Sequence, residues 1–198
     1  MAVQELLELA DDARTSLVRN ALELLNQDHP EDLSIREVAR RAGLSSGAPY
    51  HHFKTKSDLL AACAVVAWTH LCEQLEADET SDPHQALLRR ANIYMDYARS
   101  NPGPYRLMTS RLLDDDRRFE EIVALRARAM GGVIDLIVAA PGPSLSQAQA
   151  KLRGVALWSM LHGQASLEIN QSLIDASELD LAMEIPRLAV RMALLPTS

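Results

Sequence analysis

Cysteine is scarce in this chain, and long apolar runs are missing. Only two of the 198 residues are cysteine, Cys63 and Cys72. On one predicted helix they would lie roughly 13 Å apart along the axis, too far for a disulfide. We therefore expect two core thiols, as in a protein of the reducing cytoplasm. No stretch of eighteen apolar residues occurs, which argues against a membrane span, and the acidic first residues are unlike a signal peptide.

The sequence patterns of catalytic and metal sites are also missing. There is no CxxC, HExxH or phosphate-binding loop, and no nucleophile lies at a telling distance from a base. His51 and His52 are adjacent, and neighbouring helical residues point about 100° apart, so they would seldom share a metal ion. We therefore expect no enzyme, no cofactor and no metal site.

Strand-like alternation is nearly absent as well. Apolar residues recur at the helical period between segments that contain proline, glycine and asparagine. This pattern predicts an all-α protein. The expected helices reach to about residue 26, span 56–77 and 83–100, reach to about 113 and 139, and span about 146–170 and 180–195.

Residues 33–59 have the pattern of a helix-turn-helix. Ser34, followed three residues later by Glu37, predicts a capping box at the start of a short helix. Gly43 follows this helix where a left-handed residue is needed. A second short helix comes next, and a motif of this kind places its second helix in the major groove of DNA.

The second helix of this motif is expected to begin after a serine cap. Either Ser45 or Ser46 can provide the cap. Pro49 then falls in the first turn, whose backbone donors have no internal partners, so the proline costs little there. Tyr50 and Phe53 are three residues apart and would give the helix one aromatic edge.

Charge in this segment differs from charge in the rest of the chain. Residues 34–56 hold five basic residues and one acidic residue, whereas the whole chain carries −7. Thr55 and Asp58 predict a further capping box, which would put Lys56 at the positive end of a helix dipole at a cost of up to about 1 kcal/mol. A bound DNA phosphate would explain this lysine, and a merely solvated side chain is the alternative.

The motif resembles the signature of the TetR family of transcriptional repressors over about residues 10–60. The matching positions are Val38, Ala39, Ala42, Gly43, Leu44, Ser45, Gly47, Tyr50, His52, Phe53, Lys56, Leu59 and Leu60. The resemblance implies an all-α homodimer. Residues 1–56 would form a three-helix DNA-binding domain, and residues 57–198 a larger helical domain for effector binding and dimerisation.

The same resemblance assigns DNA contacts by position. The expected DNA-binding residues are Ser34, Arg36, Ser45, Ser46, Gly47, Ala48, Tyr50, His51, His52 and Lys56. Residues 45–48 would begin the recognition helix nearest the base edges, and Tyr50, His51 and Lys56 would hold phosphates. Pro49 replaces the more usual Thr, Leu or Ile, and a proline donates nothing to a base.

The carboxy-terminal half is expected to hold the effector. Trp158, His162 and Gly163 resemble the Trp-x-x-x-His-Gly pattern of one subgroup of such domains, and Asn101-Pro102 fits it too. Methionines and aromatics suit an adaptable apolar site, although each can equally be core packing. The candidate lining residues are Tyr94, Tyr97, Tyr105, Met108, Met130, Trp158 and His162.

The predicted helix that begins after a cap at Ser144 or Ser146 and ends at about residue 170 is apolar on all sides. Such a helix must be buried on all sides, either in a deep core or against a partner subunit. Together with the last helix it would form a four-helix interface about a two-fold axis. The residues expected there are Leu152, Val155, Ser159, Gly163, Leu167, Leu188 and Met192.

The sequence therefore predicts a cytoplasmic, homodimeric DNA-binding regulator. The favoured form is a repressor that a small-molecule effector releases from a palindromic double-stranded operator. The alternative on the same fold is an activator or a co-repressor-dependent regulator. A third and less favoured hypothesis is an enzyme or carrier of small apolar molecules that uses the helix-turn-helix only as structure.

Overall fold

The computed structural model describes residues 12–27, 29–77, 81–113, 120–142, 144–170 and 180–195. Within these ranges the chain is helical and contains no strand, so the all-α prediction is confirmed. The helices, in order, are α1 (Ala13–Leu25), α2 (Ile35–Arg41), α3 (Pro49–His52), α4 (Lys56–Glu76), α5 (Pro83–Ser100), α6 (Pro102–Thr109), α7 (Glu120–Ala139), α8 (Gln147–Ile169) and α9 (Leu181–Leu194), with short helical turns η2 (Pro30–Asp32) and η3 (Arg111–Leu113).

The chain divides into two compact units. The first contains Met1–His70 and Ser100–Leu125, and the second contains Leu71–Arg99 and Arg126–Ser198. The helix-turn-helix motif lies entirely in the first unit. The predicted boundary after residue 56 concerns function rather than packing, and it stays a prediction.

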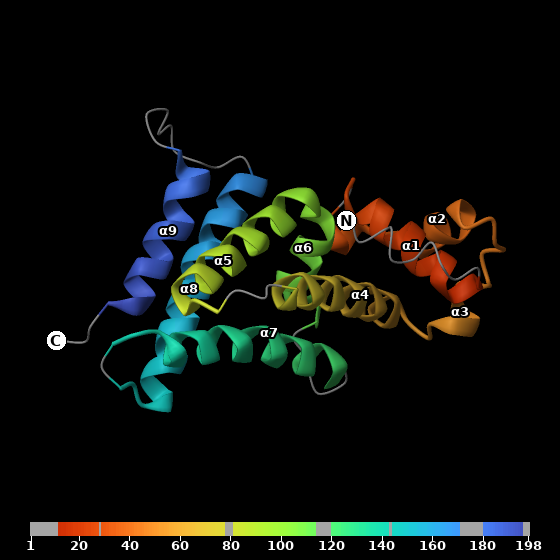
Figure 1. Ribbon diagram of the computed structural model, residues 1–198. Helices are drawn as coiled ribbons and strands as arrows, with labels where there is room; N and C mark the ends of the chain where they lie inside the picture. The colour runs from red at the N-terminus through yellow and green to blue at the C-terminus, as the bar shows by residue number, and fades with distance from the viewer. Residues whose placement is uncertain are drawn as a thin grey trace. The chain divides into compact units, whose positions relative to one another are not determined.

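Helix α1 is the centre of the first unit, because α2, α3 and α6 all pack against it (Figure 1). Asp12 caps this helix by accepting a 2.9 Å hydrogen bond from the Thr15 backbone N–H. Leu17, Leu22 and Leu25 of α1 are fully buried. Burying a leucine side chain stabilises a fold by about 1.5–3 kcal/mol, so these residues hold the motif on a rigid support.

Gly103 allows α6 to lie directly against the end of α1. A Cβ atom at this position would collide with the Leu25 carbonyl group and with the Asn26 nitrogen. The Gly103 backbone N–H also donates to Asn26 Oδ1 at 3.1 Å. A residue without a side chain is therefore required where these two backbones meet.

In the second unit α8 packs along α9. Ser146 begins α8 with a complete capping box, in which its hydroxyl and the Gln149 side chain each accept from the other's backbone N–H. Of Ser144 and Ser146, the two serines expected to cap this helix, Ser146 is the one used. Arg153 donates to the Ala193 carbonyl oxygen at 3.1 Å, which ties α8 to the end of α9.

Two ion pairs join other helices of this unit. Arg99 of α5 binds Glu168 of α8, with Nε to Oε2 at 2.7 Å, and Arg128 of α7 binds Glu76 of α4. In each pair the arginine forms two hydrogen bonds with the carboxylate, the geometry that best fixes the orientation of both side chains.

Several remaining predictions have clear outcomes. Cys63 and Cys72 are buried thiols that are not joined in a disulfide, and burial raises the pKa of the Cys63 thiol to about 12. Pro186, which the sequence predicts either to kink the last helix or to begin its main part, lies inside α9. The sequence also contains an acidic run at residues 114–116, which is typical of a helix start, and this run lies outside the described residues. None of the helices within the described ranges is long and apolar enough to span a bilayer.

Candidate nucleic-acid interface

Helix α2 places its apolar residues inward and its charges outward. Val38 and Ala39 are fully buried, whereas Arg36 and Arg40 are exposed. Ser34 caps the helix by accepting from the Glu37 backbone N–H. The other half of the predicted capping box is wrong, because the Glu37 carboxylate bonds to arginine side chains instead.

Glu37 is the anionic centre of a small surface network. Its carboxylate accepts from Arg40 Nη2 at 2.6 Å and from Arg41 Nε at 3.2 Å. The hydrogen bonds from Arg40, and then those from Arg41, lower the pKa of Glu37 to about 2. Arg41 also donates to the Gln27 side chain. One carboxylate therefore holds two of the five basic residues of segment 34–56 in place.

Gly43 makes the turn of the motif as predicted. Its φ of 69° lies in the left-handed region that favours glycine. The next residue, Leu44, is bonded back to α2, since its N–H donates to the Ala39 carbonyl oxygen at 2.9 Å. This bond fixes the direction in which the chain leaves α2.

The recognition helix begins later than predicted. Residues 45–48 form turns, in which the Ala48 N–H donates to the Ser45 carbonyl oxygen, and regular helix starts at Pro49. Ala48 is the N-cap residue, and no side chain caps the helix, so neither predicted serine cap is formed. The physical reason is that proline has no N–H and a fixed φ, which suits the first helical position without a cap.

Helix α3 divides its residues between the core and the solvent. Pro49 is buried, whereas Tyr50 is 55% exposed and His51 and His52 are exposed. Phe53 follows the helix in extended conformation and is only 4% exposed, so the expected aromatic edge with Tyr50 does not form. Pro49 is turned toward the core, whereas Ser45, Ser46 and Gly47, which precede it, are exposed.

Lys56 has a partner within the chain. The predicted capping box at the start of α4 is confirmed, since Thr55 and Asp58 exchange side chain-to-backbone bonds of 2.8 and 3.2 Å. The Lys56 ammonium group donates to the Glu31 carbonyl oxygen at 2.5 Å. This bond accounts for a lysine at the helix start without a phosphate, and the phosphate contact stays a prediction.

The predicted effector residues are divided between the two compact units. Tyr105 and Met108 belong to the first unit, whereas Tyr94, Tyr97, Met130, Trp158 and His162 belong to the second. The three tyrosines and Met108 are buried. Trp158 is partly exposed and stacks on His162, with ring centroids 5.7 Å apart, and burial lowers the pKa of His162. Their role in ligand binding stays a prediction.

The predicted dimer residues lie on the outside of α8 and α9. Leu152 is 70% exposed, Met192 is 52% exposed, and Val155, Leu167 and Leu188 are also large exposed apolar residues. Ser159 is exposed and Gly163 half-buried on the same helix. Within one chain, therefore, α8 is not buried on all sides, and one apolar face of it is open.

Two features of the first unit were not found from the sequence. Glu37 holds Arg40 and Arg41, although its spacing to them by three and four residues could have indicated these ion pairs. Arg14 of α1 lies over the ring of Phe53, with its guanidinium carbon 5.3 Å from the ring centroid. No local pattern indicates a contact between residues so far apart in the chain.

The geometry of the first unit defines a helix-turn-helix protein with an exposed, basic motif. Comparison with known proteins agrees. Residues 17–63 match the family described as bacterial regulatory proteins, tetR family, and residues 87–191 match the tetracyclin repressor-like C-terminal domain. The chain belongs to the TetR family and is a DNA-binding transcriptional regulator. Membership of a family of regulators supports the prediction that it is not an enzyme.

Individual relatives agree with this assignment. The chain is 27% identical over 178 residues to an uncharacterized HTH-type transcriptional regulator of Mycobacterium tuberculosis, covering 88% of this chain and 78% of that protein. The fold is similar to that of a TetR-family regulator from Streptomyces coelicolor, with a TM-score of 0.68, 21% identity, and coverage of 91% of this chain and 78% of that one.

A further solved structure carries a ligand. FadR from Bacillus subtilis, in complex with stearoyl-CoA, matches with a TM-score of 0.69 and 15% identity over 88% of this chain and 96% of that one. At this identity the likeness shows the fold alone. The Trp-His-Gly subgroup is not distinguished by any of these matches.

Proposed function

We propose that two copies of this chain bind a palindromic DNA operator and repress transcription. A two-fold dimer would present two recognition helices about 34 Å apart, one turn of the double helix. The observation that carries this proposal is the exposed α2–α3 motif, with hydroxyls, a phenol and cations on its outer side and its apolar residues buried. Such a surface suits a polyanion with polar base edges.

The groups available for base reading are few. Ser45 and Ser46 are exposed at the approach to α3, and a serine hydroxyl can donate to or accept from any base edge. Gly47 is exposed too and lets the backbone approach the groove wall closely. Tyr50, His51 and Arg36 are exposed around these residues and are assigned to phosphates and neighbouring bases.

The open face of α8 and α9 supports the homodimer. Large apolar side chains are exposed on both helices, and the interface of an obligate dimer is rich in such residues. At Gly163 a Cβ atom would meet nothing within 4 Å. A glycine in the middle of an open helix face lets a second helix approach closely, and two helices from each copy would complete a four-helix interface.

A small-molecule effector would act by preferring one conformer of the dimer. To release the protein from DNA, the effector must bind more tightly to the conformer that does not bind DNA than to the conformer that does. We assign the carboxy-terminal domain to the Trp-His-Gly subgroup, supported by the stacked Trp158–His162 pair, and we place the protein in the cytoplasm with its DNA. An activator on the same fold would differ only in the sign of the effector's effect.

A gel shift on the intergenic DNA beside the protein's own gene tests the proposal. We expect binding whose logarithm falls steeply with the logarithm of the salt concentration. Tyr50→Phe and Lys56→Ala should each weaken binding, and loss of the Lys56 charge should reduce the salt slope by about one. Lys151→Ala, which removes an exposed lysine from α8, is the matched control.

The outcomes separate the roles. If both variants bind with wild-type strength, the phosphate contacts assigned to them are wrong. If the wild-type protein binds no DNA specifically, or binds with a flat salt dependence, the proposed function itself is wrong and a small-molecule carrier becomes the better hypothesis.

A further inference from the structure

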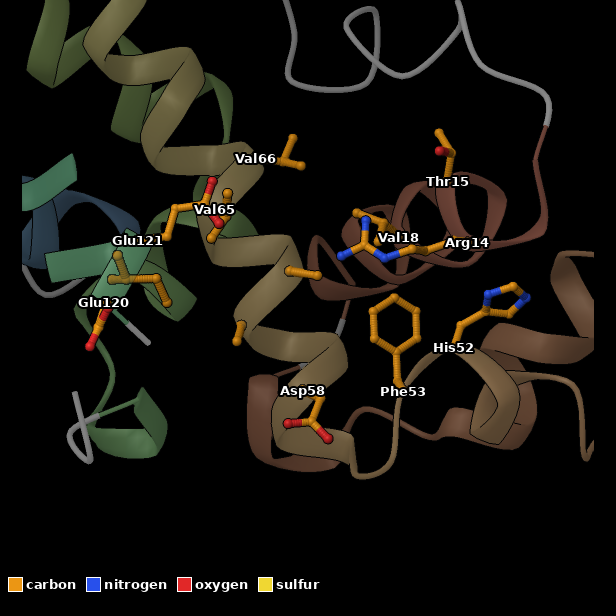
Figure 2. Close-up of a pocket in the computed structure, with 13 residues that line it drawn as sticks. Arg14, Thr15, Val18, His52, Phe53, Asp58, Val65, Val66, Glu120 and Glu121 are labelled. Atoms are coloured by element: carbon orange, nitrogen blue, oxygen red, sulfur yellow. The ribbon is translucent and has the colours of Figure 1, made fainter. Parts of the chain in front are cut away.

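The first unit contains a cleft of about 540 Å³, a size that suits a small molecule. Its walls come from α1, from the end of α3 and the residue after it, from α4, and from the first turn of α7 (Figure 2). None of the residues predicted as effector contacts lines this cleft. It is therefore a separate site from the one expected in the carboxy-terminal domain.

Charge is separated along the cleft. Arg14 and His52 lie at one end, and Glu120 and Glu121 lie at the other, as Figure 2 shows. Asp58 also lines the cleft, and its carboxylate keeps its negative charge while it accepts from the Thr55 backbone N–H at 2.8 Å. The two ends of the cleft thus carry opposite charges, Arg14 on α1 and the two glutamates on α7.

The floor between the two ends is apolar. Val65 and Val66 of α4 lie between the glutamates and Arg14 in Figure 2, and Ala61 and Ala62 precede them on the same helix. Val18 contributes from α1. An apolar floor with a few charged groups at its rim is the usual lining of a small-molecule site.

We propose that this cleft binds a zwitterionic small molecule with an apolar body. Its ammonium group would lie at Glu120 and Glu121, its carboxylate at Arg14, and its methylene chain on the valines of α4. The glutamates would repel the second end of a purely anionic ligand, and Arg14 would repel the second end of a purely cationic one. Only a molecule with opposite charges at its two ends satisfies both walls.

A ligand bound in this cleft would affect the recognition helix α3 through the contact between Arg14 and Phe53. The Arg14 guanidinium covers the ring of Phe53, and the Phe53 N–H closes α3 by donating to the Pro49 carbonyl oxygen at 2.8 Å. A carboxylate can bond to the edge of the Arg14 guanidinium while the face stays on the ring, and this pairing reduces the attraction of the cation for Phe53 at the end of α3. The ligand therefore changes the affinity for DNA, a consequence that rests on the proposed function, whereas binding itself does not.

Isothermal titration calorimetry on the full chain without DNA tests the binding. The probes are the ω-amino acids aminohexanoate, aminooctanoate and aminododecanoate, each compared with the alkylamine and the fatty acid of the same chain length. We expect one amino acid to bind about tenfold or more tightly than both of its singly charged counterparts, because charge-assisted hydrogen bonds form at both ends.

Three variants locate the site. Val65→Trp fills the cleft and should abolish binding. Arg14→Gln and the double variant Glu120→Gln/Glu121→Gln should each remove the advantage of the zwitterion over its singly charged counterparts. Lys151→Gln on α8 is the charge-matched control for Arg14→Gln, and Asp135→Asn combined with Glu73→Gln is the control for the double variant. All three control positions lie outside the lining, and thermal melts check that every variant is folded.

Clear results would overturn the proposal. Absence of binding by every amino acid in the series, equal binding of amine and amino acid, or unchanged binding by the folded Val65→Trp or glutamine variants would each do so. Gel shifts with and without the bound amino acid test the coupling separately. If the chain binds no operator, the proposed function fails while the calorimetry still decides whether the cleft is a site.

Discussion

The motif of α2 and α3 and the outer face of α8 and α9 are both exposed, yet they differ in chemistry. Around the motif the exposed side chains are hydroxyls, imidazoles, a phenol and arginines, and the apolar residues Val38, Ala39 and Phe53 are buried. On α8 and α9 leucines and methionines are exposed instead, Leu152 by 70%. The same chain thus leaves polar groups open in one region and apolar groups open in the other.

This difference indicates two kinds of partner. A polar, cationic surface loses little by staying in water and gains when a phosphate backbone releases its counterions. An exposed apolar face is unfavourable in water, at about 25 cal/mol for each Å² that a partner could cover. The polar surface is stable in water without DNA, whereas the apolar face is expected to be covered permanently by another copy of the chain.

The largest effect is expected from charging the apolar face. Leu188→Glu combined with Met192→Glu should give monomers by size-exclusion chromatography with light scattering, because four like charges would meet across the two-fold axis. Affinity for the operator should fall by about a hundredfold or more, since the second half-site is no longer bound at high effective concentration.

Two exposed alanines of α7 provide the control for this variant. Ala124→Glu with Ala127→Glu adds the same charge to two exposed positions of α7 outside the predicted interface residues and should leave a dimer. A Leu188→Glu/Met192→Glu protein that remains dimeric and keeps its operator affinity would show that this face is not the interface. The chemical difference between the two surfaces would then not indicate two kinds of partner.

A smaller effect is expected from the tight contact beneath the motif. Gly103→Ala should lower the free energy of unfolding by about 1–3 kcal/mol, because a Cβ atom would collide with the Leu25 backbone. Urea unfolding at fixed protein concentration measures the change. Gly131→Ala is the matched control in α7, where a Cβ atom meets nothing within 4 Å, and it should stabilise by about 0.5–1 kcal/mol.

This pair of variants separates a closed contact from an open helix surface. Equal stability of Gly103→Ala and the wild-type protein would mean that α6 can move away from α1 without loss. The support of the motif would then be looser than the packing against α1 indicates.

The smallest effect is expected at Glu37. Glu37→Gln should release Arg40 and Arg41 and remove one negative charge, which should raise non-specific DNA affinity about twofold to fivefold at low salt. Fluorescence anisotropy with a random duplex measures the change, and Glu184→Gln on α9, whose carboxylate pairs with Arg187, is the control. A weaker Glu37→Gln protein would show that the carboxylate positions these arginines for DNA.

The same residue gives a pH prediction. The pKa of Glu37 is lowered from 4.5 to about 2, so its ion pairs stabilise the folded chain above about pH 5 and are lost as the pH falls toward 2. The carboxyl group should therefore stay charged between pH 5 and 8, and NMR titration of its side-chain carbon should show no change in that range.

Much of the fold could be predicted from local signals. Asp58 three residues after Thr55, a glycine at Gly43 and a serine at Ser146 each specify a helix end through bonds to the nearest backbone. The start of α3 was misplaced, because a proline at the first helical position begins a helix without any cap. Local rules were therefore reliable where a side chain bonds to its own turn.

For the candidate site, the sequence indicates which residues belong to the motif but not what these residues contact. The sequence placed the basic residues around α2 and α3 and identified the exposed Ser45, Ser46 and Tyr50. It could not show that Lys56 bonds to the Glu31 carbonyl oxygen or that Pro49 is turned inward. These facts depend on how the short helices pack against one another.

By itself the sequence determined the helices, the helix-turn-helix and the basic charge of that segment, because caps, turn glycines and periodic apolar residues act over a few neighbouring positions. Only the tertiary structure decided that Arg14 covers Phe53 and that a cleft with opposite charges at its ends lies between α1, α4 and α7. Those features join residues far apart in the chain, and their distances depend on the packing of helices rather than on the preferences of any one segment.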